Sequence, residues 1–306
     1  IDCTPISVGA PYFNLTFGAL VAPVLLALPV GPLLAWKRGD LPAALRRLWL
    51  AALVALLAAL ATFGLVTPRS LLAACGVALG AWVIFGALAE AAERVRAFRA
   101  PWPEVGRRTL GLPRGAWGMS LAHVGIGVFA LGASFETAWR AEGAEALRLG
   151  QRMHVAGYEL RLDQVGQEFG PNYVGERALI RVTRRDGRLL CVAAPDRKLY
   201  AARAQTISGV AICPTALDDL YVVAGDKRVG ADGAPAWLIR AYWNPWVRFI
   251  FAGPLLMALG GLVSLSDRRL RFAVTRRARA QPAVEPTPDS LPGPAPAPAP
   301  AAEPAE

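Results

Sequence analysis

The sequence is short of the residues on which most soluble enzyme sites are built. Two histidines and four cysteines are spread over 306 residues. No CxxC pair and no cysteine–histidine cluster with metal spacing occurs, so neither a zinc site nor dithiol redox chemistry is supported. P-loops, GxGxxG motifs and serines flanked by nucleophile-elbow glycines are also missing. These absences exclude the common nucleotide-binding and hydrolytic enzyme classes.

Apolar residues, in contrast, make up 54% of the chain, and its mean hydropathy is +0.36. Single soluble domains rarely reach that value. Five runs are apolar enough to cross a hydrocarbon core about 30 Å thick, so we predict a polytopic α-helical membrane protein with about five transmembrane helices. Pro23, Pro29 and Pro32 fall in the first run, which we expect to be kinked or partly re-entrant. The runs are Leu15–Trp36, Arg47–Val66, Leu71–Ala89, Gly115–Phe135 and Arg248–Ser266.

The net charge of +10 is placed in a way that argues against nucleic acid as a partner. Lysine and arginine gather in three segments, which five crossings would put on one side of the membrane. The positive-inside rule assigns that side to the cytoplasm. Solvated loops touching anionic headgroups explain the charge, so we expect membrane lipid as the contact. The segments are Lys37–Arg47, Arg94–Arg114 and Arg268–Arg279.

Between the fourth and fifth runs, Glu136–Pro245 has an ordinary soluble composition. Apolar and polar residues alternate over Tyr158–Val165 and again over Arg177–Arg184, and Asp186-Gly187 then gives a hairpin signal. This pattern predicts a small β sandwich or open barrel, large enough to have its own core. With five crossings it would lie on the periplasmic side.

The end of the chain has a different composition. From Gln281 onward it is almost entirely proline, alanine and glutamate, which predicts an extended, disordered tail. The expected organisation is therefore four transmembrane helices in 1–136, a periplasmic β-rich domain in 137–247, a fifth transmembrane helix in 248–267, and a basic cytoplasmic segment with the tail in 268–306. Ile1 stands at the start with no signal peptide after it, so we expect the chain to be cut from a longer protein.

His123 lies deep inside the fourth apolar run. An ionisable side chain at bilayer depth is costly and suggests a function, and imidazole is the usual ligand of haem iron. On a helix, Gly127 and Ala130 share its face and would leave room for a flat macrocycle. A structural histidine that hydrogen-bonds to a neighbouring helix remains an equal alternative. A separate ridge of small residues allows close helix approach; it consists of Gly118, Ala122 and Gly125.

The other histidine and the cysteines suggest no chemistry. His154 begins the strand region, and we expect a surface or half-buried side chain without a ligand role. Cys191 and Cys213 lie in the extracytoplasmic segment, where a disulfide is chemically permitted. We favour two unpaired small hydrophobic residues there, with pairing left open. Cys3 and Cys75 lie near or within the membrane.

Four segments together carry a resemblance to a known protein family through their order and spacing. They are Ile6–Asn14, Ser120–Val128, Gly170–Tyr173 and Trp246–Leu262, the last ending in Ala258-Leu-Gly-Gly before a basic stretch. Together they resemble the C-terminal part of the CcmF family, the haem lyases of the bacterial cytochrome c maturation system. The resemblance runs from about Ile6 to Arg271 and ends before the Pro/Ala tail.

The resemblance implies a membrane component that attaches haem to CxxCH apocytochromes c in the periplasm. Proteins of this family are longer and hold a b-type haem between two membrane histidines, of which His123 matches the second. The first membrane histidine, a tryptophan-rich segment and two external histidines have no counterpart in this sequence. Haem b would therefore be shared with a missing N-terminal portion, with His123 as one axial ligand of the haem iron; the catalytic residues stay unknown.

The resemblance also implies partners and a location. The partners would be the N-terminal half of the haem lyase, a haem chaperone and the subunits that present apocytochrome c, all at the bacterial inner membrane. We expect this chain to act as part of the enzyme and to be inactive alone. The alternative is a non-enzymatic scaffold or docking subunit for cytochrome c assembly, without haem of its own. A transporter is disfavoured, because the interiors of the runs lack charged residues and no clear inverted repeat is visible.

Overall fold

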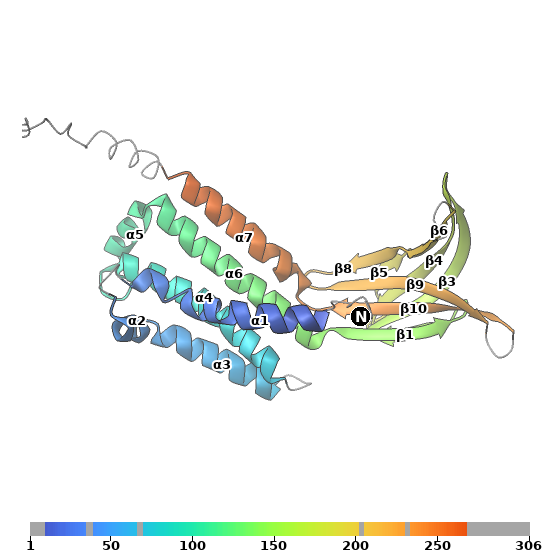
Figure 1. The fold of residues 1–306 in the computed structure, drawn as a ribbon, viewed down its shortest axis with the longest axis horizontal. Helices are drawn as coiled ribbons and strands as arrows, with labels where there is room; N and C mark the ends of the chain where they lie inside the picture. Colours follow the sequence, from blue (N-terminus) through green and yellow to red (C-terminus); the bar gives the residue numbers. More distant parts are fainter. Residues whose placement is uncertain (1–9, 35–38, 66–69, 202–204, 230–232, 268–306) are drawn as a thin grey trace, which may run out of the picture. The chain divides into compact units, whose positions relative to one another are not determined.

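The computed structural model describes residues 10–34, 39–65, 70–201, 205–229 and 233–267. Over these residues a group of helices is followed by a run of strands and then by one more helix (Figure 1). Several sequence-based predictions lie outside the described residues. They concern Cys3, the basic stretch Arg268–Arg279 and the tail from Gln281.

The helices agree with the apolar runs. Four of the described helices are long and apolar enough to cross a membrane, or up to five if α2 and α3, bent by 61° at their junction, form one span. In the first run, α1 contains Pro23 and ends before Pro29, and a short 3-10 helix at Gly31–Leu33 includes Pro32. Pro29 and Pro32 thus follow the end of α1, but Thr16–Leu33 still forms one membrane-length stretch, so the kinked or re-entrant course stays a prediction. The α-helices are α1 Ala10–Ala27, α2 Leu41–Arg47, α3 Trp49–Leu65, α4 Leu71–Val95, α5 Trp102–Gly111, α6 Arg114–Trp139 and α7 Val247–Leu265.

Helix α4 extends beyond the predicted run. Its first turn is capped by Ser70, whose hydroxyl accepts a hydrogen bond from the Ala73 N–H at 3.2 Å. The run was predicted to end at Ala89, but the helix continues to Val95 and ends at Arg96 in the left-handed conformation, φ 55°. Glu90 and Arg94 form an ion pair at positions i and i+4 within this extension, which supports the extra turns.

Glycines set the packing of α6 against its neighbours. A Cβ on Gly125 would lie 2.7 Å from the Gly253 carbonyl oxygen, and one on Gly132 would lie 2.7 Å from Phe249 Cβ. Helices α6 and α7 therefore approach backbone to backbone (Figure 1). Gly118 meets Gly260 in the same way, which confirms the predicted small-residue ridge.

The strands build two antiparallel sheets, as predicted for a sandwich. One sheet has the order β1-β10-β9-β8; the other has the order β2-β3-β4-β6-β7, with β5 paired to β4. Gly187, at φ 78°, closes the β4–β5 hairpin. Across this hairpin the Arg184 N–H donates a hydrogen bond to the Arg188 carbonyl oxygen. The strands are β1 Ala141–Leu147, β2 Arg152–Val155, β3 Tyr158–Phe169, β4 Tyr173–Arg184, β5 Leu189–Ala193, β6 Asp196–Tyr200, β7 Gln205–Ser208, β8 Val210–Pro214, β9 Asp219–Val229 and β10 Pro235–Asn244.

Alternate residues of the two sheets form the sandwich core. Leu160 and Leu162 of β3 face Ile239 of β10 within one cluster, and all three side chains are fully buried. The polar residues between them lie on the outer face. The period-two pattern of Tyr158–Val165 therefore predicted the buried face correctly, up to a register shift between Leu162 and Gln164.

The structure corrects our preference for unpaired cysteines in this domain. Cys191 and Cys213 form a disulfide, with their Cα atoms 6.0 Å apart. Cys191 lies on β5 and Cys213 on β8, so the bond joins the two sheets. The prediction failed because alternation shows which residues point inward, and it does not show which inward residues meet. Cys75 is free.

Candidate functional site

His123 lies in the middle of α6, with its side chain half-buried. Among the residues that the structure describes, none donates to or accepts from its imidazole in a hydrogen bond. The structural alternative, in which His123 hydrogen-bonds to a neighbouring helix, therefore finds no partner in this part of the chain. An imidazole in an apolar helix that is left open in this way can serve as a ligand.

The expected room beside Gly127 is filled by α4. A Cβ on Gly127 would lie 2.6 Å from Ile84 Cγ1 and 2.9 Å from the Gly80 carbonyl oxygen. Our expectation that this glycine leaves space for a flat macrocycle was wrong, because Gly127 serves close packing of α4 on α6. The side of α6 that carries Met119, Ile126 and Ala130 stays partly exposed, so a ligand would reach His123 from there.

A buried carboxylate on α4 lies near the same level of the bundle. Gly80 meets Leu131 and Ile84 meets Gly127, so α4 and α6 run antiparallel. Glu90 follows Ile84 by six residues, about 9 Å along the axis, and His123 precedes Gly127 by four, about 6 Å, so the two residues lie within about 3 Å of the same level.

Glu90 is only 4% exposed, and its carboxylate is incompletely paired. One oxygen, Oε1, pairs with the Arg94 guanidinium, whereas Oε2 is buried and has no hydrogen-bond partner among the described residues. Sequence reasoning missed this residue because it placed the end of the apolar run one position earlier. The i,i+4 spacing of Glu90 and Arg94 was the available signal that the helix continues.

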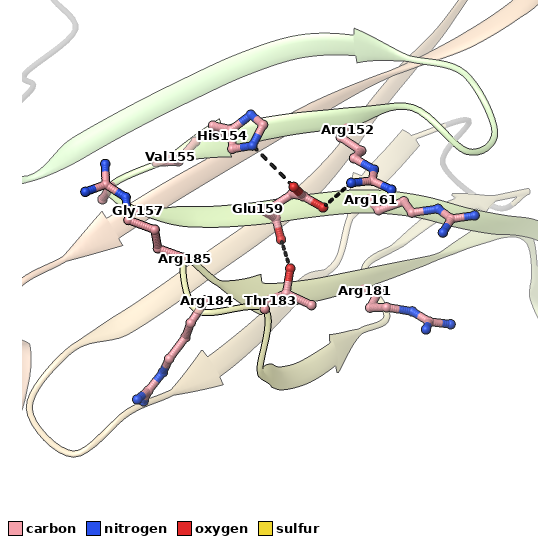
Figure 2. A pocket seen from close by; sticks show the side chains of 12 residues that line it. Arg152, His154, Val155, Gly157, Glu159, Arg161, Arg181, Thr183, Arg184 and Arg185 are labelled. Carbon is pink, nitrogen blue, oxygen red and sulfur yellow. Dashed lines mark hydrogen bonds and ion pairs between the residues drawn. The ribbon is translucent and has the colours of Figure 1, made fainter.

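His154 lies far from this site, on the outer face of the second sheet. Its side chain is 71% exposed, and its Nε2 lies 3.4 Å from Glu159 Oε2. The expectation of a surface histidine is confirmed. His154 lines a hollow of about 620 Å³ whose other residues come from β2, β3, β4 and the turns that follow β2 and β4 (Figure 2).

Arginines dominate the lining of this hollow. Arg152 is opposite Arg161 in the β2–β3 register, and Arg161 is opposite Arg181 in the β3–β4 register. Glu159 pairs with Arg152 at 3.0 Å, while Asp163 pairs with Arg161 at 3.2 Å and with Arg181 at 2.8 Å. The sequence gives no hint of this row, because it arises only when three strands align.

A polar cluster holds the Gly170–Tyr173 turn at the other end of β3 and β4. The Tyr173 hydroxyl donates to Glu168 Oε1 at 3.1 Å, and this bond raises the pKa of Tyr173. Lys198 pairs with Asp196 at 3.0 Å, and the bond to Asp196 raises the pKa of Lys198. These contacts fix the hairpin. No group of three or more His, Cys, Asp or Glu residues suited to a metal ion occurs in the described ranges.

The comparisons with known proteins concern both parts of the chain. Residues 138–245 match the family described as "CcmF C-terminal beta-sandwich". The cytochrome c-type biogenesis protein CycK of Bradyrhizobium diazoefficiens is 41% identical over 280 residues, which cover 92% of this chain and 42% of that protein. The cytochrome c-type biogenesis protein CcmF of Escherichia coli is 33% identical over 281 residues, which cover 91% of this chain and 41% of that protein.

A solved structure gives the same picture of the fold. The protein described as "Cytochrome c Heme Lyase CcmF" matches with a TM-score of 0.63 at 24% sequence identity, covering 84% of this chain and 41% of that chain. The likeness shows a shared fold. The chain spans about two fifths of the length of the curated relatives it matches.

Proposed function

Because the chain corresponds to the C-terminal part of the CcmF family of cytochrome c-type biogenesis proteins, we propose that it is the C-terminal half of a membrane haem lyase complex. The complex attaches haem to CxxCH apocytochromes c in the periplasm. Its other components are the N-terminal half of the lyase, a haem chaperone and apocytochrome-presenting subunits. The apolar helices lie in the bacterial inner membrane, and the β sandwich extends into the periplasm.

The part of this chain in the proposed complex is to hold a b-type haem through His123. One observation supports it most directly: a half-buried imidazole in an apolar helix, without a hydrogen-bond partner among the described residues. Such a nitrogen fits an iron ligand, and the partly exposed side of α6 gives access to it. The second axial ligand would come from the N-terminal half. When bound, the haem supplies one-electron redox chemistry.

Glu90 fits the same proposal. Ligating histidines commonly have a carboxylate in their surroundings, which orients the ring and increases its basicity. Glu90 offers a buried oxygen without a partner at the level of His123. Helix packing then has a clear role, because the Gly80–Gly127 contact holds α4 and α6 at a fixed separation and so fixes the carboxylate relative to the imidazole.

The proposal is tested by the absorption spectrum of this chain co-expressed with the N-terminal half of a full-length relative. The wild-type pair should give a low-spin b-type haem spectrum. His123→Ala should weaken or abolish it, because the iron loses one of two axial bonds. Added imidazole should partly restore it. His154→Ala is the matched control and should leave the spectrum intact, since that side chain is exposed on the β sandwich.

The second candidate is a scaffold or docking subunit without haem of its own. The observation that favours it is the open, charged face of the β sandwich, which offers a surface to other proteins. If His123→Ala keeps an unaltered low-spin spectrum and still supports cytochrome c assembly, the haem-ligand proposal is wrong and the scaffold replaces it.

A further inference from the structure

The outer face of β2, β3 and β4 carries positive charge in an arrangement that is unfavourable by itself. Arg152, Arg161 and Arg181 are in register on three adjacent strands. Neighbouring strands lie about 4.8 Å apart, so the outer two of these arginines start only about 10 Å apart. Like charges directly opposite each other destabilise a sheet. A row of three is therefore a feature that the fold itself does not need.

The carboxylates of this face neutralise the row only in part. Glu159 and Asp163 pair with the three arginines, and Asp163 is shared between two of them. Arg184 and Arg185 complete the lining, and no ion pair to either is found among the described residues. The five lining arginines and the two carboxylates paired with them leave an excess of three positive charges, and Asp186 lies with Arg184 and Arg185 in the lining of the adjoining hollow. Figure 2 shows the Arg152 guanidinium paired with Glu159, whereas the side chains of Arg161, Arg181 and Arg184 extend away from that carboxylate.

We propose that this arginine trough (Arg152, Arg161, Arg181, Arg184 and Arg185) binds an acidic segment of another protein. Guanidinium groups bind carboxylates through two parallel N–H···O hydrogen bonds. Clusters of arginine are therefore common binding sites for acidic motifs. The proposal stands apart from the haem role of His123, because it concerns another element of the fold and another chemistry.

The residues that line the hollow argue against other negatively charged ligands. Among the described residues, no Phe, Tyr or Trp side chain lines the hollow and His154 offers its one aromatic ring, so single-stranded nucleic acid would find little stacking surface. Val155 and Ala156 are the apolar lining side chains, too few for a flat apolar ligand or a lipid chain. A single small anion would fill little of about 620 Å³ and would meet one or two arginines at a time.

An extended acidic segment can span the row of charges. Side chains on one face of an extended chain repeat about every 6.8 Å. A segment that crosses the three strands can therefore place one carboxylate near each end of the arginine row. Further carboxylates would reach the two arginines of the β4–β5 hairpin. Affinity would come from several exposed pairs, so it should fall steeply with salt.

The test uses the full chain in nanodiscs of uncharged lipid and a fluorescent hexaglutamate peptide as the probe. Fluorescence anisotropy should show binding that weakens with added salt. The double variant Arg161→Gln, Arg181→Gln should bind at least tenfold more weakly. Arg188→Gln is the matched control: this arginine is 86% exposed and outside the lining, and its variant should bind within twofold of wild type.

Thermal unfolding separates lost binding from lost structure. The double variant removes the like-charge row, so its midpoint should be no lower than that of the wild type. No binding by the wild-type chain, or equal loss in the double variant and in Arg188→Gln, would overturn the proposal. Vesicles with 30% phosphatidylglycerol, roughly the charge density of an anionic leaflet, form the second arm. Binding to them that depends on Arg161 and Arg181, with none to the peptide, would replace the acidic segment by a lipid surface.

Discussion

At the scale of single residues, the unusual group is the carboxylate of Glu90. It is 4% exposed in a helix long and apolar enough to span a membrane, and its partner Arg94 has 36% of its side chain exposed. Removing one member of a buried ion pair leaves the other charge uncompensated, whereas apolar replacement of both can be neutral. Glu90 is the more buried member of the pair, so its carboxylate is the charge that depends most on the partner.

We expect Arg94→Ala to lower the free energy of unfolding by about 1–3 kcal/mol, because the Glu90 carboxylate, 4% exposed, is left without its charged partner. Thermal unfolding of the detergent-solubilised chain, followed by circular dichroism, measures this. Glu93→Ala is the control, because its ion pair with Arg99 is exposed and 3.6 Å long; it should change stability by less than about 0.5 kcal/mol. Equal losses in both variants would contradict the role given to Glu90.

Single residues also show where sequence reasoning succeeds. His123 was found because a polar residue in an apolar run is visible without any structure. Glu90 was missed because a hydropathy boundary does not say where a helix ends. Gly127 was misjudged for a different reason: a helical wheel places it beside His123, but only the structure shows that Ile84 of α4 occupies the adjoining space.

At the scale of elements, α6 is a helix with two glycine-lined contacts. Gly125 and its neighbours meet α7, while Gly127 meets α4. Small residues let helix backbones approach closely, which is the main source of helix association within a lipid solvent. The hydropathy of these helices is local information, so their positions were predicted well. The pairing of glycines between helices is not local, and neither is the cross-sheet disulfide or the arginine register.

Gly125→Ala should therefore push α6 and α7 apart. Its new Cβ would meet backbone, namely the Gly253 carbonyl oxygen at 2.7 Å and the Met257 nitrogen at 2.8 Å, which cannot move aside as a flexible side chain would. We expect a loss of about 1–3 kcal/mol, measured by thermal unfolding in the same detergent. Gly106→Ala in α5, where a Cβ meets nothing within 4 Å, should be neutral or stabilising by up to about 1 kcal/mol. A stable Gly125→Ala variant would count against the close helix contact.

At the scale of the whole molecule, two parts with different solvents share one chain. Helices that expose large apolar side chains, such as Leu57 and Leu60 of α3, require lipid around them. The β sandwich has a dry core and a charged outer face, as a domain in water has. The order of these parts along the sequence was predictable from composition, because apolar runs favour lipid and segments of mixed polarity favour water.

The five-span topology predicts that α5 and the β sandwich lie on opposite sides of the membrane. The basic segment around Arg99 should be cytoplasmic and the hairpin at Gly187 periplasmic. Reporter fusions, with alkaline phosphatase for the periplasm and a fluorescent protein for the cytoplasm, read out each position. Reports from the same side at both positions would remove the five-span arrangement.

The disulfide between Cys191 and Cys213 gives the β sandwich a dependence on its chemical surroundings. A bond that ties one sheet to the other persists where thiols are oxidised and is rare where glutathione keeps them reduced. Attachment of haem to a CxxCH segment needs the opposite condition, since the substrate must offer free thiols. A chain with the proposed function would thus be assembled oxidised while it serves a reduced substrate. Thiolate attack on a disulfide requires access, and Cys213 is only 1% exposed. Burial therefore shields the Cys213 sulfur from the thiols that the complex is proposed to handle, whereas Cys191 is half-buried and is the end at which such a thiol would attack.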